Sequence, residues 1–386
     1  MVQGRPRTEG MNSRSKLTVC EYQGRCDAKG NAVGHAPKVL SEYVSYVRDD
    51  FDVTVYAPET ILKASELKGI KRKVLNDFIV MEGNSSFFSK IFNKFRMFRN
   101  ISSALKYSEA DKIWFFNTEF YLMLYLALFG NRGKEIYITT FMEGFLAGKN
   151  GPFAKIKQKI FEKAQKKIKL IISAGPAFSF KNAPSVFIPD YACDPAVFDI
   201  PEGHVPEDAD IAEFVADHKK DGFAVCLGTM NPEKQLEEMT EAFKCTGYPL
   251  LIAGRFYDPE RLTALKKSAG RETLVKNTYL SKEDYAWLLK NAFMVVLPYA
   301  KDQYSAQTSG VMQEAVFAGT PVMAYEEVLL GNRVPGIGIR SFDSLKESFK
   351  APSEADTQAL KESYSELRRT RYSREIIKKS LIKALS

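Results

Sequence analysis

The chain reads Gln307-Thr308-Ser309-Gly310-Val311-Met312-Gln313-Glu314-Ala315-Val316-Phe317-Ala318-Gly319-Thr320-Pro321-Val322 between two short apolar runs that are typical of buried strands. Ser309 is a common N-cap and Gly319 a common helix end, so the stretch predicts a helix over residues 310–318. The first N–H groups of such a helix lack partners within it, and the helix dipole adds about half a positive charge at this end. A diphosphate suits that position, because Gly310 lets a phosphate approach the backbone and Glu314, one turn further on, can accept hydrogen bonds from ribose hydroxyls. The same residues also suit a capped helix that binds nothing, and this stretch alone leaves both interpretations open.

Short apolar runs and amphipathic stretches alternate on both sides of this segment, which is the pattern of βαβ units and parallel sheets. In the first half we expect strands over residues 17–22, 53–57, 112–116, 135–140 and 170–173, with a shorter candidate at 186–188. In the second half we expect strands over residues 223–227, 250–253, near 274, 293–297 and 321–324 and helices over 233–243, 259–268, 282–291 and 310–318. The pattern therefore predicts an α/β protein with two doubly wound, Rossmann-like halves.

An acidic stretch over residues 194–221, with Pro195, Pro201 and Pro206, separates the two series and is expected to be loop-like. A chain of 386 residues also exceeds the size at which one hydrophobic core keeps growing. We expect a disordered extension over residues 1–16, an N-terminal domain over 17–200 and a C-terminal domain over 201–352. Residues 353–386 are expected to form terminal helices that could cross back to the N-terminal domain.

The composition restricts the class of protein and its partners. With 45% hydrophobic and 26% charged residues, the chain resembles folded rather than disordered proteins. Its five cysteines lack the spacing of a zinc site, which favours a reduced, cytoplasmic protein. There is no signal-peptide core and no run of about 18 apolar residues, so neither export nor a membrane span is expected. The net charge of +8 calls for an anionic partner, which could be nucleic acid, lipid or nucleotide phosphate.

The segment quoted first resembles the donor-binding signature of the family-4-like GT-B glycosyltransferases, the bacterial glycosyltransferase group 1 type. That signature is Glu-x7-Glu followed by Ala-x-x-x-Gly-x-Pro-Val. Its second Glu falls on Glu314, but its first falls on Ala306, so the carboxylate that normally holds hydroxyls of the donor sugar is absent. Gln303 or Gln307 could supply a neutral amide instead. The resemblance implies two Rossmann-like domains facing a central cleft, with a nucleotide diphosphate sugar in the C-terminal domain and an acceptor in the N-terminal domain.

Two further stretches extend the resemblance. Residues 223–235 resemble the strand that ends in Gly-Arg-Leu and precedes the phosphate-binding lysine, which falls on Lys234. The arginine of the family falls on Thr229, and Arg255 at the next strand end could restore that cation. Residues 279–284 match the region whose backbone grips the base. The implied donor-binding residues are Gly34, Thr229, Lys234, Arg255, Leu280, Gln307, Thr308, Ser309, Gly310, Val311 and Glu314.

The acceptor-side candidates lie in the N-terminal half. Residues 30–35 follow the first expected strand and precede a helix, as does the Gly-rich acceptor-side loop of the family, although His35 could equally be a surface histidine. Ligands of open α/β sheets gather at the carboxyl ends of strands, where residues 117–119 and 140–144 lie. The acceptor-side candidates are therefore His35, Asn117, Glu119 and Glu143.

The resemblance implies transfer with retention of anomeric configuration, for which no enzymatic base is strictly required. Lys234, Arg255 and the helix start at Gly310 would stabilise the departing diphosphate. If the enzyme inverts instead, Glu143 is the candidate base, which completes a catalytic set of Lys234, Arg255 and Glu143. Asp50-Phe51-Asp52 and Asp208-Ala209-Asp210 formally match a metal-binding Asp-x-Asp, but both are interpreted as turn carboxylates. We expect no metal and no cofactor besides the nucleotide sugar as co-substrate. Two alternatives remain open: a catalytically degenerate binding or scaffold subunit, and a sugar-nucleotide epimerase of the same fold.

Two basic stretches, residues 87–99 and 153–169, mix Lys and Arg with Phe and Ile. Such a mixture suits the interface of an anionic membrane. The alternative is a helix packed on the sheet with a charged outer face, and it is slightly favoured for the second stretch. Nucleic acid is not expected as a partner, because no recognised binding module is present. We therefore expect a peripheral enzyme at the inner face of the cell membrane that acts on a lipid-linked or saccharide acceptor in polysaccharide biosynthesis.

Overall fold

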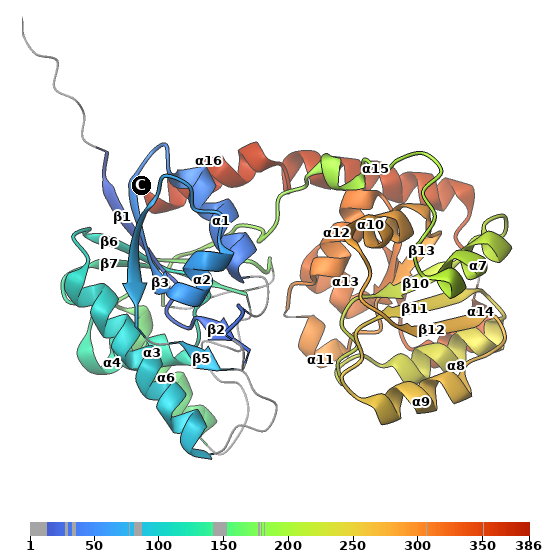
Figure 1. The fold of residues 1–386 in the computed structure, drawn as a ribbon, viewed down its shortest axis with the longest axis horizontal. Coiled ribbons are helices and arrows are strands. Elements are labelled where there is room, and N and C mark those ends of the chain that lie inside the picture. The colour runs from blue at the N-terminus through green and yellow to red at the C-terminus, as the bar shows by residue number, and fades with distance from the viewer. Residues whose placement is uncertain are drawn as a thin grey trace, which may run out of the picture.

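The computed structural model describes residues 14–27, 30–32, 36–76, 78–80, 87–141, 153–176, 178, 180, 182–305, 307–349 and 351–386. Figure 1 shows two α/β domains side by side, each with a twisted sheet between helices. The expected α/β class with two doubly wound halves is confirmed. The N-terminal sheet starts at Lys16, while residues 1–13 of the expected extension lie outside the described residues.

The N-terminal domain is built on a parallel sheet with the strand order β4-β3-β1-β6-β7-β8-β9. Its strands are β1 (Lys16–Cys20), β3 (Asp52–Pro58), β4 (Lys71–Leu75), β6 (Lys112–Phe115), β7 (Glu135–Thr140), β8 (Leu170–Ser173) and β9 (Ser185–Phe187). Its helices are α1 (Ala36–Val47), α2 (Glu59–Ala64), α3 (Phe87–Tyr107), α4 (Phe120–Phe129) and α6 (Ala154–Gln165). A small ladder joins β2 (Arg25–Cys26) and β5 (Ile79–Val80).

Both faces of the N-terminal sheet are covered, which is why its central strands are continuously apolar. Leu17 and Val19 of β1 belong to the core that includes α1, whereas Cys20 and Ile113 belong to the core that includes α3, α4 and α6. The ring of Tyr43 on α1 stacks on Trp114 of β6 with centroids 5.8 Å apart. The alternation of strand and helix therefore places helices on both faces of the sheet and buries a separate hydrophobic core on each face.

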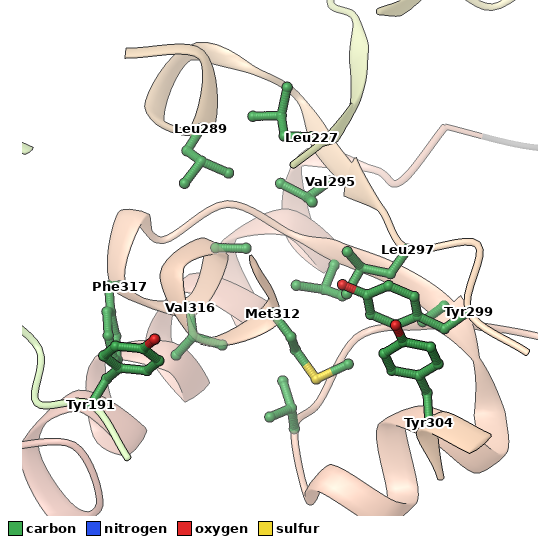
Figure 2. Packing of buried hydrophobic residues seen from close by; sticks show 14 of the residues in the cluster. Tyr191, Leu227, Leu289, Val295, Leu297, Tyr299, Tyr304, Met312, Val316 and Phe317 are labelled. Atoms are coloured by element: carbon green, nitrogen blue, oxygen red, sulfur yellow. The ribbon is translucent and has the colours of Figure 1, made fainter. Parts of the chain in front are cut away.

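The C-terminal domain has the strand order β12-β11-β10-β13-β14-β15. Its strands are β10 (Ala224–Leu227), β11 (Leu250–Gly254), β12 (Thr273–Asn277), β13 (Met294–Val296), β14 (Val322–Tyr325) and β15 (Ile337–Ile339). Its helices are α7 (Ala209–His218), α8 (Leu236–Thr246), α9 (Pro259–Ser268), α10 (Lys282–Asn291), α11 (Lys301–Tyr304), α12 (Gly310–Ala318), α13 (Glu326–Asn332) and α14 (Phe342–Ser348). Figure 2 shows Met312 and Val316 of α12 packed beneath the strands of this domain.

The connections tie the two domains together. A 3-10 turn, η1 (Pro195–Phe198), follows β9, and α15 (Glu354–Thr370) and α16 (Arg374–Leu385) end the chain. On α15, Arg368 Nη1 donates to the carbonyl of Phe317 on α12 at 2.9 Å. On α16, Arg374 Nη2 donates to Ser45 Oγ of α1 at 3.2 Å, and Figure 1 shows this helix lying over the N-terminal domain.

The structure differs from the sequence-based expectation in two respects. Residues 194–221, expected to be loop-like, contain η1 and α7, because Asp208 caps a helix whose Ile211, Phe214 and Val215 pack inward. Strands β2, β4, β5 and β15 were not expected, because β4 is a basic, exposed edge strand and the other three are short. None of the helices in the described part of the chain has the length and apolar character to span a bilayer.

Candidate functional site

A cavity of about 550 Å³ lies between the two domains. Its walls are built from residues at the carboxyl ends of strands in both sheets, the position at which open α/β sheets bind ligands. The sequence-predicted residues that line it are Asn117, Thr229, Lys234, Gln307, Thr308, Ser309, Gly310, Val311 and Glu314. The cleft thus brings together most of the predicted donor site and one predicted acceptor-side residue.

The start of α12 forms one wall of the cavity. Ser309 Oγ accepts a hydrogen bond from the N–H of Met312 at 3.1 Å and lies 2.8 Å from the hydroxyl of Tyr299. The ring of Tyr299 stacks on Tyr304 with centroids 3.8 Å apart, as Figure 2 shows. A Cβ added to Gly310 would meet nothing closer than Tyr191, at 3.8 Å. The helix start is therefore rigidly held and open to a ligand.

Glu314 lies one turn into α12 and faces the same cavity. Its Oε2 accepts a hydrogen bond from the hydroxyl of Tyr285 on α10 at 2.6 Å. Burial raises the pKa of Glu314, whereas the Tyr285 hydroxyl and the charge of Lys38 act in the opposite direction. The carboxyl group is thus oriented by one hydroxyl, as a group that accepts hydrogen bonds from a ligand should be.

Lys234 supplies a buried positive charge. Its side chain is 4% exposed, and its Nζ donates to the carbonyl of Leu227 at 3.1 Å and lies 5.7 Å from the ring centroid of Tyr299. Burial lowers the pKa of Lys234. Among the residues that the structure describes, no carboxylate forms an ion pair with this ammonium group. A buried cation without a counterion is costly, and an anion in the cavity would offset that cost.

Three predicted residues that the structure describes lie outside the cavity lining: Arg255, Leu280 and Glu119. The side chain of Arg255 is exposed, and its guanidinium lies over the ring of Tyr257 at 5.7 Å. The reason is local: a Cβ at Gly254 would come within 1.8 Å of the Gly228 carbonyl, so the two strand ends touch through backbone and Arg255 continues outward. The structure therefore does not bring Arg255 to the cavity as the replacement cation.

Leu280 packs against the hydrophobic core, and Glu119 forms an ion pair with Arg25, which does line the cavity. The remaining predicted residues, Gly34, His35 and Glu143, lie outside the described residues, as does Ala306. The side chain of Gln303 is likewise outside what the structure describes.

The N-terminal wall of the cavity contains a polar network. Asn117, two residues after the end of β6, has a positive φ of 53°, and its carbonyl accepts a hydrogen bond from Gln23 Nε2. Gln23 Oε1 in turn accepts from Arg25 Nε at 2.8 Å. Sequence reasoning missed Arg25 and also Glu21, which directly follows β1 and lines the cavity. The strand-end rule that selected Asn117 applies equally to Glu21.

Asp190 is a third residue that sequence reasoning missed. It lies just after β9, in the connection between the domains, and its Oδ1 accepts a hydrogen bond from Gln313 Nε2 of α12 at 2.8 Å. Burial raises its pKa to about 6. This contact joins the N-terminal domain's last strand to the helix that carries Glu314.

The Asp-x-Asp segments take part in ordinary surface ion pairs. Lys276 Nζ lies 3.0 Å from Asp208 and 2.6 Å from Asp210, and Lys71 Nζ lies 2.9 Å from Asp52. Within the described ranges, no three or more His, Cys, Asp or Glu residues are grouped to hold a metal ion. The positive groups that line the cavity are Lys234, the start of α12 and Arg25, which is paired with Glu119.

No family model matches the chain, and no curated protein matches it. Solved structures do match it over almost its whole length. HepE from Anabaena, in a complex with UDP and glucose, is 14% identical, with 96% of this chain and 99% of that chain covered and a TM-score of 0.61. An α,α-trehalose 6-phosphate synthase from Burkholderia multivorans is 10% identical, with 96% and 98% covered and a TM-score of 0.63. A glycosyltransferase from Rickettsia africae is 12% identical, with 96% and 97% covered and a TM-score of 0.58. The chain thus has the two-domain GT-B architecture of these proteins.

Proposed function

We propose that this protein is a glycosyltransferase of the family-4-like type that moves a sugar from a nucleotide diphosphate sugar to an acceptor bound in the cleft. The observation that carries the proposal is the buried ammonium group of Lys234, which lines the same cavity as the start of α12. Two positive groups that converge on one cavity without a described counterion suit a diphosphate.

The donor would lie against the C-terminal wall. Its diphosphate would accept hydrogen bonds from the N–H groups at the start of α12, and its ribose hydroxyls would donate to Glu314. The Anabaena protein was solved with UDP and glucose and, in another structure, with UDP-glucose. UDP-glucose is therefore the first donor to try.

Catalysis would rest on electrostatic stabilisation. The leaving diphosphate gains negative charge as the bond to the sugar breaks, and Lys234 and the helix start would stabilise that charge. These groups would take the place of a metal ion, so we propose a metal-independent reaction. We also propose retention of anomeric configuration, in which the leaving phosphate itself can receive the proton of the acceptor hydroxyl.

The acceptor is proposed to be lipid-linked or a polysaccharide, on the basis of an exposed apolar surface. On α3, Phe88, Phe92 and Phe95 are 71%, 62% and 64% exposed, and their spacing is that of one helix face. Phe153 and Ile156 at the start of α6 are 62% and 56% exposed. We call these five residues the apolar patch. The helix α6 adds four lysines, Lys155, Lys157, Lys159 and Lys163.

Helix α4 connects the two helices that carry the apolar patch to the acceptor side of the cavity. Lys94 Nζ of α3 and Lys157 Nζ of α6 each lie 5.8 Å from a ring in the first turn of α4, Tyr121 and Phe120 respectively. Helix α4 begins directly after Glu119, at the sheet edge that carries Asn117. Basic and apolar side chains together bind anionic lipid surfaces. We propose that the protein docks peripherally on the cytoplasmic membrane face, with the cleft near the lipid.

A ligand screen tests the proposed function. The thermal unfolding of the protein is followed with UDP, GDP, ADP and UDP-glucose, since a ligand at a hundred times its Kd adds about 2.7 kcal/mol to the free energy of unfolding. We expect stabilisation by at least one nucleotide diphosphate and slow release of that nucleotide from its sugar conjugate without added metal. If the nucleotide sugar binds but no nucleotide is released from it, even in the presence of membrane extract and saccharides, the protein is not the proposed enzyme. No stabilisation by any of the nucleotides would contradict the donor site itself.

A further inference from the structure

Glu21 is a buried carboxyl group in the cavity for which the proposed donor site has no use. It directly follows β1, lines the N-terminal wall and is 1% exposed. Its Oε1 accepts hydrogen bonds from the N–H groups of Gln23 at 2.9 Å and Gly24 at 3.4 Å. Its Oε2 is buried and has no hydrogen-bond partner among the described residues. Such unpaired groups are rare in folded proteins and call for a partner that the described residues do not supply.

The positive charge nearest to Glu21 is already paired with another carboxylate. Arg25, the nearest lining cation, forms an ion pair with Glu119 and also donates to Gln23. Burial raises the pKa of Glu21 to about 8, and the N–H groups of Gln23 and Gly24 and the charge of Arg25 only partly oppose this effect. At neutral pH the carboxyl group is therefore mostly protonated. In that form it both donates and accepts hydrogen bonds.

The neighbouring walls suit the rest of a sugar ring. Asn117 offers a polar residue at the next strand end, while Phe141 and Ala36 contribute apolar surface to the same cavity. A pyranose has hydroxyl groups at its edge and C–H groups on its faces, so it needs both kinds of contact. The N-terminal wall thus differs from the C-terminal wall, where Lys234 and the helix start favour an anion.

Resting on the proposed transferase, we propose that Glu21 binds a hydroxyl group of the acceptor and selects an uncharged saccharide unit at this position. Oε2 is the atom that takes the hydroxyl, while the backbone N–H groups hold the other oxygen. An acceptor with a carboxylate beside this hydroxyl is disfavoured, because the wall offers it no unpaired cation among the described residues.

Saturation-transfer NMR at pH 7 with UDP present tests this assignment. The probes are methyl glucopyranoside, which is neutral, and methyl glucopyranosiduronate, which carries a carboxylate. The wild type should bind the neutral glycoside and bind the uronate at least about threefold more weakly. Glu21→Ala should weaken the neutral glycoside about three- to tenfold, whereas Glu21→Gln, which still donates and accepts, should bind like the wild type. Glu135→Gln, the same change at the opposite edge of the sheet, should have no effect.

The pH dependence of the wild type provides a test that needs no variant. Raising the pH through about 8 ionises Glu21 and removes its hydrogen-bond donor. Affinity for the neutral glycoside should then fall in the wild type but not in Glu21→Gln. The groups nearest to Glu21 that also carry charge or titrate are Arg25, Glu119, Cys20 and Tyr22, and all four are present in both proteins.

The outcomes separate this inference from the proposed function. Unchanged glycoside binding in Glu21→Ala overturns the role of Glu21, and a pH-independent affinity in the wild type overturns its binding as a protonated acid. Equal binding of glycoside and uronate, or no binding of the glycoside while UDP still binds, overturns the proposed acceptor class. If UDP itself fails to bind the wild type, the transferase proposal fails instead.

Discussion

At the scale of single residues, Lys234 matches the family's phosphate-binding lysine, whereas Thr229 stands where the family has an arginine. The position of Lys234 explains how one cation could suffice. Its ammonium group is held by the Leu227 carbonyl and lies over the Tyr299 ring, so the protein fixes the charge without neutralising it. Arg255 cannot play the same part from its exposed position beside Tyr257. In the proposed reaction, one fixed cation and the dipole of α12 would share the stabilisation of the leaving group.

Lys234→Ala should lower kcat about a hundredfold, equivalent to roughly 2.7 kcal/mol, with a smaller effect on the KM of the donor. The reason is that the charge on the diphosphate grows in the transition state. Steady-state kinetics of UDP release from UDP-glucose measures the change. Arg255→Ala serves as the control and should stay within about twofold of the wild type, as is usual for exposed side chains away from a site. Equal losses in both variants would show that Arg255 does reach the diphosphate.

The raised pKa of Glu21 also predicts how stability depends on pH. The folded protein holds a proton on this carboxyl up to about pH 8, whereas the unfolded chain releases it near the ordinary value of 4.5. The contribution to the free energy of unfolding is thus fully present below 4.5 and is lost as the pH rises through about 8. Relative to Glu21→Gln, the wild type should lose stability by up to about 1.4 kcal/mol per pH unit in this range. Urea denaturation measures the free energy of unfolding of both proteins at each pH. If this free energy depends on pH in the same way in both, Glu21 does not have a raised pKa.

At the scale of elements, α12 illustrates how local signals determine structure. Ser309 accepts from the Met312 N–H, and Gly319 ends the helix with a φ of 79°, so the predicted bounds 310–318 are confirmed. Helices α9 and α10 also match their predicted bounds, because Asp258 and Ser281 cap them. Capping depends on a few neighbouring residues and can therefore be predicted from sequence.

The sequence-based predictions were wrong or incomplete for strand β4, for the direction of Arg255 and for Glu21. Strand β4 carries Lys71, Arg72 and Lys73 in its exposed part and is a strand only because it pairs with β3. The direction of Arg255 depends on a contact between Gly254 and Gly228. Glu21 was missed because it was placed inside the expected strand over residues 17–22, whereas β1 ends at Cys20. The pairing of β4 with β3 and the contact between Gly254 and Gly228 each join separate segments, which local sequence patterns do not predict.

The contact between α10 and α12 should determine nucleotide affinity. Glu314→Gln should weaken UDP binding roughly tenfold or more, because hydrogen bonds to a charged group contribute about 1.5 to 3 kcal/mol. Tyr285→Phe keeps the ring but removes the hydroxyl that orients Glu314, so its effect should be smaller. Isothermal titration with UDP gives both values. Unchanged affinity in Glu314→Gln would remove this residue from the donor site.

The exposed face of α3 should determine membrane binding. Replacing Phe92 and Phe95 together with Ser should reduce sedimentation with anionic vesicles at low salt, because both rings would insert into the lipid interface. Leu330→Ser is a matched control, since Leu330 is 75% exposed but lies on α13 of the other domain. Release of UDP from UDP-glucose without vesicles should be unchanged in all these variants. Equal vesicle binding by the double variant and the wild type would contradict the docking surface.

At the scale of the whole molecule, the two domains are joined by contacts whose two partners are far apart in sequence. Asp190 after β9 accepts from Gln313 of α12, Cys193 donates its N–H to the Tyr372 carbonyl at 2.7 Å, and α16 lies on α1. The orientation of the two walls of the cavity therefore depends on the connection after β9 and on the last two helices. Periodicity predicted both sheets, but contacts of this kind cannot be inferred from either half alone.

The packing of α16 on the N-terminal domain predicts how the two domains unfold. Leu381 is fully buried where α16 packs against the N-terminal domain, and Lys112 Nζ of β6 donates to the Leu385 carbonyl at 2.7 Å. The chain has two tryptophans, Trp114 in β6 and Trp287 in α10, so each domain has its own fluorescent reporter.

Leu381→Ala should cost about 2 to 5 kcal/mol, as large-to-small changes in cores do. In a Trp287→Phe background, where Trp114 alone reports, the urea midpoint should fall clearly. In a Trp114→Phe background, where Trp287 alone reports, it should fall less. Leu289→Ala, at an equally buried position on α10, is the matched control and should show the opposite pattern. If Leu381→Ala lowers both midpoints equally, the two domains unfold as one cooperative unit, and α16 does not act chiefly on the N-terminal domain.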